Sequence, residues 1–236
     1  MNQMEEIEME VSPDDLSDEI YQQQGEDVED TSLDGSRLVI SDYVSENGCV
    51  YIFSKVNGCW KYKCFLQPDA AKSETGFGID VHFSADGKYL AVMSKSASDF
   101  TNTKKIDYPV SIFKEDTEGN YSRISFVYPK FNEKGSEYGS AMYLSADAKF
   151  LFVSAELKAN DETTPCEGST GSVYIYKWDE EKKRHVPFQR LRPIEKGISK
   201  FGFSLGMDNG DLIVEDENGS MYTYYYAESW EFCSVS

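Results

Sequence analysis

The chain has 236 residues, with 42 Asp and Glu against 23 Lys and Arg, and its formal net charge is −19. A chain this acidic repels phosphate groups, so we expect neither nucleic acid nor an anionic membrane surface as its partner. No apolar run reaches the roughly 18 residues that cross a membrane, and no signal-peptide pattern is visible, which predicts a cytoplasmic protein. The five cysteines form no C-x-x-C pair and are expected to be free thiols.

The N-terminal stretch is the most acidic part of the chain, because residues 1–30 hold 12 acidic side chains and no Lys or Arg. Charge of one sign with few aromatics is typical of disorder, so residues 1–23 are expected to form a disordered tail. One piece can order locally: residues 12–15 (SPDD) resemble a helix capping box, and Leu16 and Ile20 then share one helical face. The alternatives are a solvated tail and a short helix that docks on the domain or on a basic partner.

A hairpin unit recurs along the rest of the chain, residues 24–236. Its copies are SLDGSRLVI (32–40), FGIDVHFSADGKYLAV (77–92), YGSAMYLSADAKFLFV (138–153) and FGFSLGMDNGDLIV (201–214). In the first copy, Gln24 and Gly25 stand where the others have an aromatic–glycine pair. The centre of each copy holds residues that tolerate the positive φ of a tight turn. The strand after the turn is nearly all apolar, which predicts a strand buried on both faces.

The second half of each unit repeats as strand, turn and strand. Its copies are GCVYIFSKVNGCWKYKCFLQP (48–68), YPVSIFKEDTEGNYSRISFVYP (108–129), GSVYIYKWDEEKKRHVPFQRLRP (171–193) and GSMYTYYYAESWEFCSVS (219–236). Each unit therefore offers four strands in roughly 50–60 residues, and such units form a β-propeller when they stack radially on their neighbours. A β-sandwich also has short strands and frequent turns, but it does not explain the period. We predict an all-β protein with four propeller blades, at about residues 24–70, 71–130, 131–195 and 196–236.

The ordered combination of aromatic–Gly, S-x-D-G-x-x-L-x-V and G-x-V-Y-I-[FY] resembles the FG-GAP repeat family, whose members form the β-propeller of integrin α-chains. The resemblance covers about residues 24–236. The Gly-Ala-Pro half of the motif is replaced by ISDYV, VMSKS and VSAEL, and calcium loops of the D-x-D-x-D-G pattern are absent from the sequence. Four units leave three alternatives for assembly: a closed four-bladed ring, a half-ring that forms a homodimer, and one part of a larger assembly.

The sequence offers little that indicates catalysis or metal binding. His82 falls in a predicted strand and His185 in a charged turn, and neither has an obvious orienting partner nearby in sequence, so no catalytic residue is predicted. The densest acidic candidates for calcium are Asp208, Asp211, Asp216 and Glu217. A predicted strand separates them into two pairs, so no metal site is expected. The stretch 167–172 (EGSTGS) lacks the Lys-Ser/Thr of a phosphate-binding loop and is expected to be an ordinary loop, and no cofactor is predicted.

Two long inserts, 94–107 and 155–170, fall at the same place in consecutive units and are expected to project from one face of the propeller. Loops on a rigid scaffold often carry recognition, although plain length variation is the alternative. The tyrosines at 222–226 are a second candidate, since alternation should expose some of them. The candidate interaction residues are Asp99, Phe100, Lys104, Lys105, Glu156, Lys158, Asp161, Glu162, Tyr224 and Tyr226.

These observations favour a non-enzymatic protein–protein interaction module or scaffold with a protein partner. A cell-surface adhesion protein of the integrin type is a second hypothesis, but it predicts export and calcium loops. A hydrolase or lyase with its site in the central channel is a third, and it requires acidic or histidine side chains that cluster on the inner side of the blades.

Overall fold

The fold is seen in a computed structural model of the chain, in which residues 28–44, 47–69, 74–96, 108–128, 138–155, 171–194, 197–198 and 200–236 are described. These residues form four antiparallel sheets of four strands each, with the strands of every sheet in chain order. The predicted all-β, four-bladed propeller-like fold is therefore confirmed. Within these ranges no helix is long and apolar enough to cross a bilayer.

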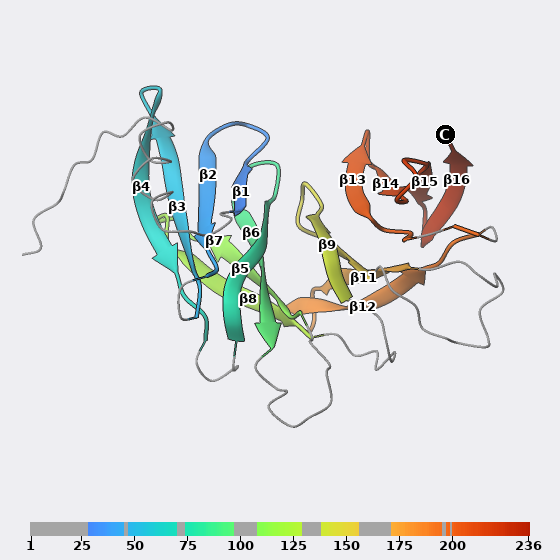
Figure 1. Cartoon of the computed structure of the whole chain (residues 1–236). Helices are drawn as coiled ribbons and strands as arrows, with labels where there is room; N and C mark the ends of the chain where they lie inside the picture. The colour runs from blue at the N-terminus through green and yellow to red at the C-terminus, as the bar shows by residue number, and fades with distance from the viewer. Residues whose placement is uncertain are drawn as a thin grey trace, which may run out of the picture.

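Each sheet is one blade (Figure 1). Blade 1 contains β1 (Val28–Thr31), β2 (Arg37–Asp42), β3 (Cys49–Val56) and β4 (Cys59–Leu66). Blade 2 contains β5 (Glu74–Phe83), β6 (Tyr89–Ser96), β7 (Val110–Glu115) and β8 (Tyr121–Val127). Blade 3 contains β9 (Tyr138–Leu144), β10 (Phe150–Ala155), β11 (Ser172–Asp179) and β12 (Arg184–Leu191). Blade 4 contains β13 (Ser204–Asp208), β14 (Asp211–Glu215), β15 (Met221–Tyr226) and β16 (Trp230–Val235).

The repeated Ser-x-Asp motif builds the turn between the first two strands in blades 1 to 3. In blade 2, the Ser84 hydroxyl donates to Asp86 Oδ1 at 3.0 Å and accepts from the backbone N–H of Tyr89 at 3.0 Å. Blades 1 and 3 repeat this arrangement with their own serines and aspartates. Gly87 has φ +66°, and Ala148 takes the equivalent place in blade 3 at φ +54°. The turn therefore needs a left-handed residue, and the short side chain of alanine is accommodated there.

The aromatic–glycine pair lies where one blade meets the blade before it. Phe77 is fully buried in a cluster that includes Val39 and Ile52 of blade 1. Gly78 has φ +97°, and a Cβ atom on it would lie 2.8 Å from the Cβ of Ser41. The aromatic side chain fills the interface, and the glycine allows the two backbones to approach closely.

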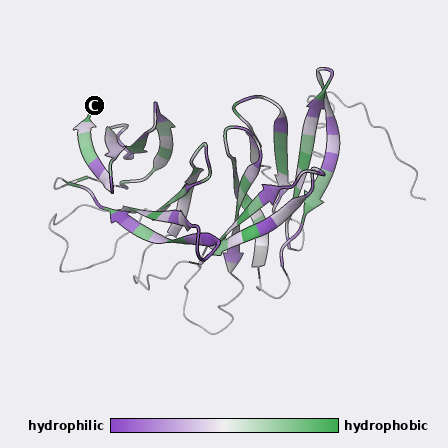
Figure 2. Ribbon diagram, turned by 180° about the vertical axis from the view of Figure 1, so that it is seen from behind, coloured by the Kyte–Doolittle hydropathy of each residue, from purple (hydrophilic) through white to green (hydrophobic). Residues whose placement is uncertain are grey.

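The second strand of each blade is the centre of the core. Leu90 and Val92 pack in a cluster with blade 1, while Ala91 and Met93 pack in a cluster with blade 3. A third cluster joins blades 3 and 4. The prediction that these strands are buried on both faces is therefore confirmed for the blades that have a neighbour on each side. Figure 2 shows the hydrophobic residues interspersed along the strands of the blades.

The blades follow one another in an open arc. The innermost strands β1, β5, β9 and β13 lie next to one another in this order. Figure 1 shows β13–β16 set apart from β1–β4, and in the described part of the chain no core cluster joins blade 4 to blade 1. The arc therefore has two free ends and a concave inner side.

Candidate functional site

One register position of the innermost strands carries a different residue in each blade. In every blade this residue pairs with the second apolar residue of the strand that follows, which is Val39, Ala91, Phe152 or Ile213. The four residues are Asp30, His82, Tyr143 and Gly206 in blades 1 to 4. Three of these four equivalent positions therefore hold side chains that can donate or accept protons.

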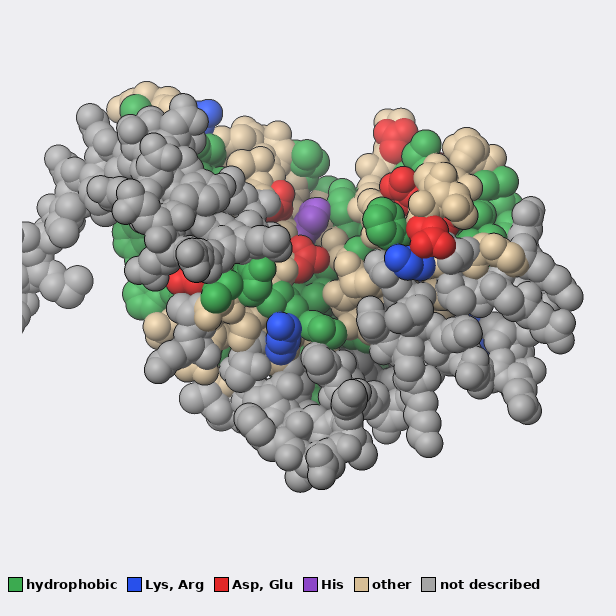
Figure 3. Space-filling view, in the orientation of Figure 1, with side chains coloured by type: hydrophobic (Ala, Val, Ile, Leu, Met, Phe, Trp, Pro, Cys, Tyr) green, Lys and Arg blue, Asp and Glu red, His purple; other side chains and the backbone are tan. Residues whose placement is uncertain are grey.

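The first three of these residues line one cavity of about 110 Å³ where β1, β5 and β9 meet. The complete lining is Asp30, Thr31, Leu33, His82, Phe83, Ala85, Tyr143, Leu144 and Ala146. We call this space the inner-strand cavity. Figure 3 shows a histidine side chain close to acidic side chains in the hollow between the blades on the concave side.

The contacts in the inner-strand cavity cross two blade boundaries. Asp30 Oδ2 accepts a hydrogen bond from the backbone N–H of Phe83 at 2.7 Å, which ties β1 to β5. The His82 ring lies 4.3 Å from the Tyr143 ring between their centroids, which ties β5 to β9. Nδ1 of His82 is buried and has no hydrogen-bond partner. A buried polar atom without a partner costs stability.

Burial sets the protonation states around the cavity. It lowers the pKa of His82, and the nearby Asp30 opposes this shift, so the imidazole is neutral at pH 7. Asp80 lies two residues before His82, on the same side of β5. Burial, together with the charge of Asp30, raises the pKa of Asp80 to about 7 against hydrogen bonds from the backbone of Val81 and Met142. Burial also raises the pKa of Tyr143.

These groups give the cavity a definite chemical character. It offers a carboxylate, a neutral imidazole and an aromatic ring, and its nine lining residues include no Lys or Arg. A guanidinium or ammonium group can pair with the carboxylate and lie against the aromatic ring. A second carboxylate from a ligand would be repelled by Asp30.

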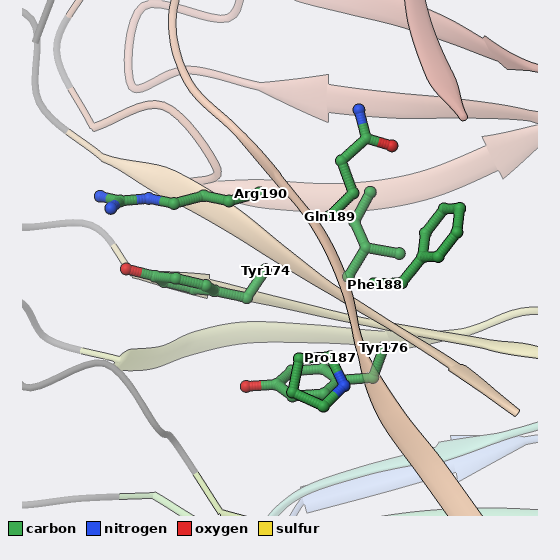
Figure 4. Close-up of a pocket in the computed structure, with 7 residues that line it drawn as sticks. Tyr174, Tyr176, Pro187, Phe188, Gln189 and Arg190 are labelled. Carbon is green, nitrogen blue, oxygen red and sulfur yellow. The ribbon is translucent and has the colours of Figure 1, made fainter. Parts of the chain in front are cut away.

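A second cavity, of about 170 Å³, lies between β11 and β12 of blade 3 (Figure 4). Figure 4 shows Arg190 extending alongside Tyr174, and the guanidinium lies 5.0 Å from the centre of that ring. Arg190 also donates to Ser172 Oγ at 2.8 Å, and Gln189 exchanges two hydrogen bonds of 2.8 Å with the backbone of Trp230. Because its polar side chains already hold blade 3 together and fasten it to blade 4, this cavity is structural.

The residues predicted from the sequence to form an interaction surface fall into two groups. Those in the two inserts lie outside the described residues; they are Asp99, Phe100, Lys104, Lys105, Glu156, Lys158, Asp161 and Glu162. Tyr224 is only 3% exposed and belongs to the core between blades 3 and 4, whereas Tyr226 is half-buried. Alternation along β15 points Tyr225 outward instead, and its hydroxyl donates to Glu231 at 2.7 Å.

Asp216 and His185, which the sequence analysis considered for metal binding and catalysis, both have structural roles. Asp216 is buried and accepts hydrogen bonds from the backbone N–H groups of Asn218 and Ser220 and from the Tyr222 hydroxyl, so it closes a hairpin turn. His185 belongs to strand β12 rather than to a charged turn. It is buried, and its Nε2 lies 2.9 Å from the carbonyl oxygen of Ala148.

Sequence reasoning missed Asp30 and Tyr143 as members of a site and treated His82 as blade architecture. A signal was present in the repeats. The turn serine and aspartate recur in the first three copies, whereas this position changes from Asp to His, Tyr and Gly. Such variation inside a repeating strand marks a position that the scaffold does not fix.

No protein-family model matches the chain, and no curated protein matches it. Solved structures with a similar arrangement include a prolyl endopeptidase, at 11% identity and a TM-score of 0.49, covering 87% of this chain and 28% of that one. Another is the propeller of Dos1, at 10% identity and a TM-score of 0.48, covering 88% of this chain and 44% of that one. Hydrazine synthase of Kuenenia stuttgartiensis has 16% identity and a TM-score of 0.43, covering 87% of this chain and 56% of that one. The chain thus spans between about a quarter and just over half of the length of these proteins.

Proposed function

We propose that the chain is a non-enzymatic protein-interaction module, and that the inner-strand cavity receives a Lys or Arg side chain of a protein partner. The observation that carries this proposal is the convergence of Asp30, His82 and Tyr143 from three blades on one small cavity. Their side chains are held by the blades themselves, so the site is preorganised for binding. The repeat pattern further leads us to propose that these are blades of the FG-GAP type.

The size of the cavity favours binding of one side chain. Pockets that bind small molecules usually measure about 300–1,000 Å³. A space of about 110 Å³ holds the end of one long side chain and leaves the rest of the partner on the concave surface. The charge of the whole chain, −19, adds attraction for a basic partner.

An array of short peptides tests this proposal. The array contains peptides with a central Lys or Arg and matched peptides with Glu or Gln at the same place. Binding to each peptide is measured for the unmodified protein and for the Asp30→Asn variant. Asparagine keeps the size of the side chain and an oxygen that can accept from Phe83, while the charge is lost. We expect basic peptides to bind preferentially and to lose about tenfold in affinity with Asp30→Asn, because a charged hydrogen bond is lost.

The control for the array is Tyr225→Phe, which removes an exposed hydroxyl on blade 4, away from the cavity. It should bind the basic peptides as the unmodified protein does. Equal binding of acidic and basic peptides, or unchanged affinity in Asp30→Asn, would contradict the proposal.

A second candidate function is an enzyme, a hydrolase or lyase, that uses the same cavity. It is favoured by one observation: Asp80, which is outside the cavity lining and has a pKa of about 7, lies two residues before neutral His82, which lines the cavity. Groups that titrate near neutrality suit acid–base catalysis. The test is turnover of a model ester or uronide. Activity that follows a bell-shaped pH profile and is absent from the His82→Ala variant would favour the enzyme over the binding module.

A further inference from the structure

The face of blade 1 that points away from blade 2 is apolar and aromatic. We call it the blade-1 outer face; its residues are Leu38, Ile40, Tyr51, Phe53, Trp60, Tyr62 and Phe65. In the following blades the same face packs on the preceding blade, as Leu90 and Val92 pack with Val39. Blade 1 has no preceding blade among the described residues.

The centre of this face is nevertheless buried. Leu38, Ile40, Phe53 and Trp60 are exposed by only 6, 5, 4 and 8%, and their cluster contains residues of β2, β3 and β4 alone. An aromatic sheet face left in water would be costly, because the burial of large apolar side chains is the main favourable contribution to folding. The cover must therefore come from a part of the chain, or from a molecule, outside the described residues.

Blade 4 is a poor match for this face. Its own free face carries Asp211 and Glu215 on β14, beside Ile213. At the positions of blade 3 equivalent to Asp211 and Ile213, Phe150 and Phe152 fill the interface with blade 4. Joining the two ends of the arc, within one chain or between copies, would bury two carboxylates against aromatic rings, where Lys55 is the one cation among the described residues of the blade-1 outer face.

We propose that the N-terminal residues 1–27 cover the blade-1 outer face, with Leu16 and Ile20 as the anchoring side chains. This segment runs directly into β1, which pairs with β2 at the edge of this face. The other undescribed pieces of blade 1, residues 45–46 and 70–73, are too short to span it, since a residue extends at most about 3.5 Å.

Apolar contact, rather than charge, carries this assignment. Residues 1–27 contain 10 acidic side chains and no Lys or Arg, while the face carries both a cation and an acid, Asp42, which follows Leu38 and Ile40 by alternation along β2. Lys55 lies on this face, with its Nζ 5.2 Å from the centre of the Trp60 ring. The segment then acts as a cap that closes the apolar end of the arc, as the terminal units of repeat proteins do.

The test is amide hydrogen exchange measured on the full chain and on Leu16→Asp/Ile20→Asp. Loss of the cap should speed exchange in residues 49–66 by about tenfold or more, because protection follows local stability, while residues 150–155 keep their protection. The control Gln22→Asp/Gln23→Asp adds the same charge to the same segment without removing an apolar side chain, and it should leave exchange unchanged.

Two results would overturn the cap. Unchanged protection of residues 49–66 in Leu16→Asp/Ile20→Asp would show that another cover is present. Sedimentation velocity that finds the unmodified chain dimeric, with dimerisation abolished by Trp60→Ala, would assign the face to a second copy instead.

Discussion

The imidazole of His82 lies against the phenol ring of Tyr143 across the boundary between blades 2 and 3, with 4.3 Å between the ring centroids. Asp30 reaches the same place from blade 1 and accepts a hydrogen bond from Phe83. Three successive blades therefore share a single site, and its geometry depends on how well the blades pack. The predictions below test that packing and the charges near the site.

We expect Gly78→Ala to destabilise the fold by about 3 kcal/mol or more. The left-handed backbone strains the alanine, and its Cβ would lie 2.8 Å from Ser41 and 2.9 Å from Val50 in blade 1. Urea unfolding measures the loss. Gly35→Ala is the matched control, because φ there is +66° and nothing lies within 4 Å of the added Cβ, so its cost should be about 1 kcal/mol. Equal losses in the two variants would contradict close approach at the blade boundary.

Equivalent residues of the second strands should differ in cost between an interior blade and the blade at the free end of the arc. Phe152→Ala removes a fully buried ring between blades 3 and 4 and should lower the free energy of unfolding by about 3–5 kcal/mol. Ile213 is the equivalent residue of blade 4 and is only half-buried, so Ile213→Ala should cost about 1 kcal/mol. Chemical denaturation of the two variants measures both losses in the free energy of unfolding. A large loss in Ile213→Ala would mean that a further partner covers blade 4.

Asp80 should make the protein less stable as the pH rises through neutrality. Its pKa in the folded protein is about 7, above the usual 3.8, so its contribution is full below pH 3.8 and is lost as the pH approaches and passes 7. Asp80→Asn stays neutral and should raise the free energy of unfolding at pH 8 by on the order of 1–3 kcal/mol, with little change at pH 4. Thermal melts at both pH values decide this, and a destabilised variant at pH 8 would refute it.

His185 should act in the opposite direction. Burial lowers its pKa below 6.5, so the unfolded chain takes up a proton before the folded one does as the pH falls. Stability is then complete above pH 6.5 and declines from there toward the lower pKa of the folded state. We expect His185→Gln to flatten this decline in urea melts between pH 7.5 and 5. An unchanged slope would show that His185 does not contribute.

The architecture could be predicted because it depends on local patterns that recur. The Ser-x-Asp turn and the apolar strand after it appear in sequence as they act in the structure, with Ser84 and Asp86 closing the turn through their own hydrogen bonds. The reason for the aromatic–glycine pair could not be read in this way. It lies in the contact of Gly78 with Ser41, 37 residues earlier in the chain.

The candidate site could not be predicted, because it depends on the register of three strands in three blades. His82 has no acidic neighbour in sequence that orients it, and only the packing of the innermost strands of three successive blades brings Asp30 and Tyr143 into the same cavity. Tyr224 is predicted from the sequence to belong to an interaction surface, but alternation along β15 buries it beside Tyr222 in the core between blades 3 and 4.

Proton NMR of the two imidazole rings tests the central proposal most directly, because the chain contains only His82 and His185. An acetylated Ala-Arg-Ala amide is titrated into the protein at pH 7.5, with the Ala-Glu-Ala peptide as its match. The account predicts that the His82 signal shifts with the arginine peptide alone, that Asp30→Asn abolishes the shift, and that the signal of buried His185 stays in place. Equal shifts with both peptides, or no shift of His82 at saturating arginine peptide, would contradict it.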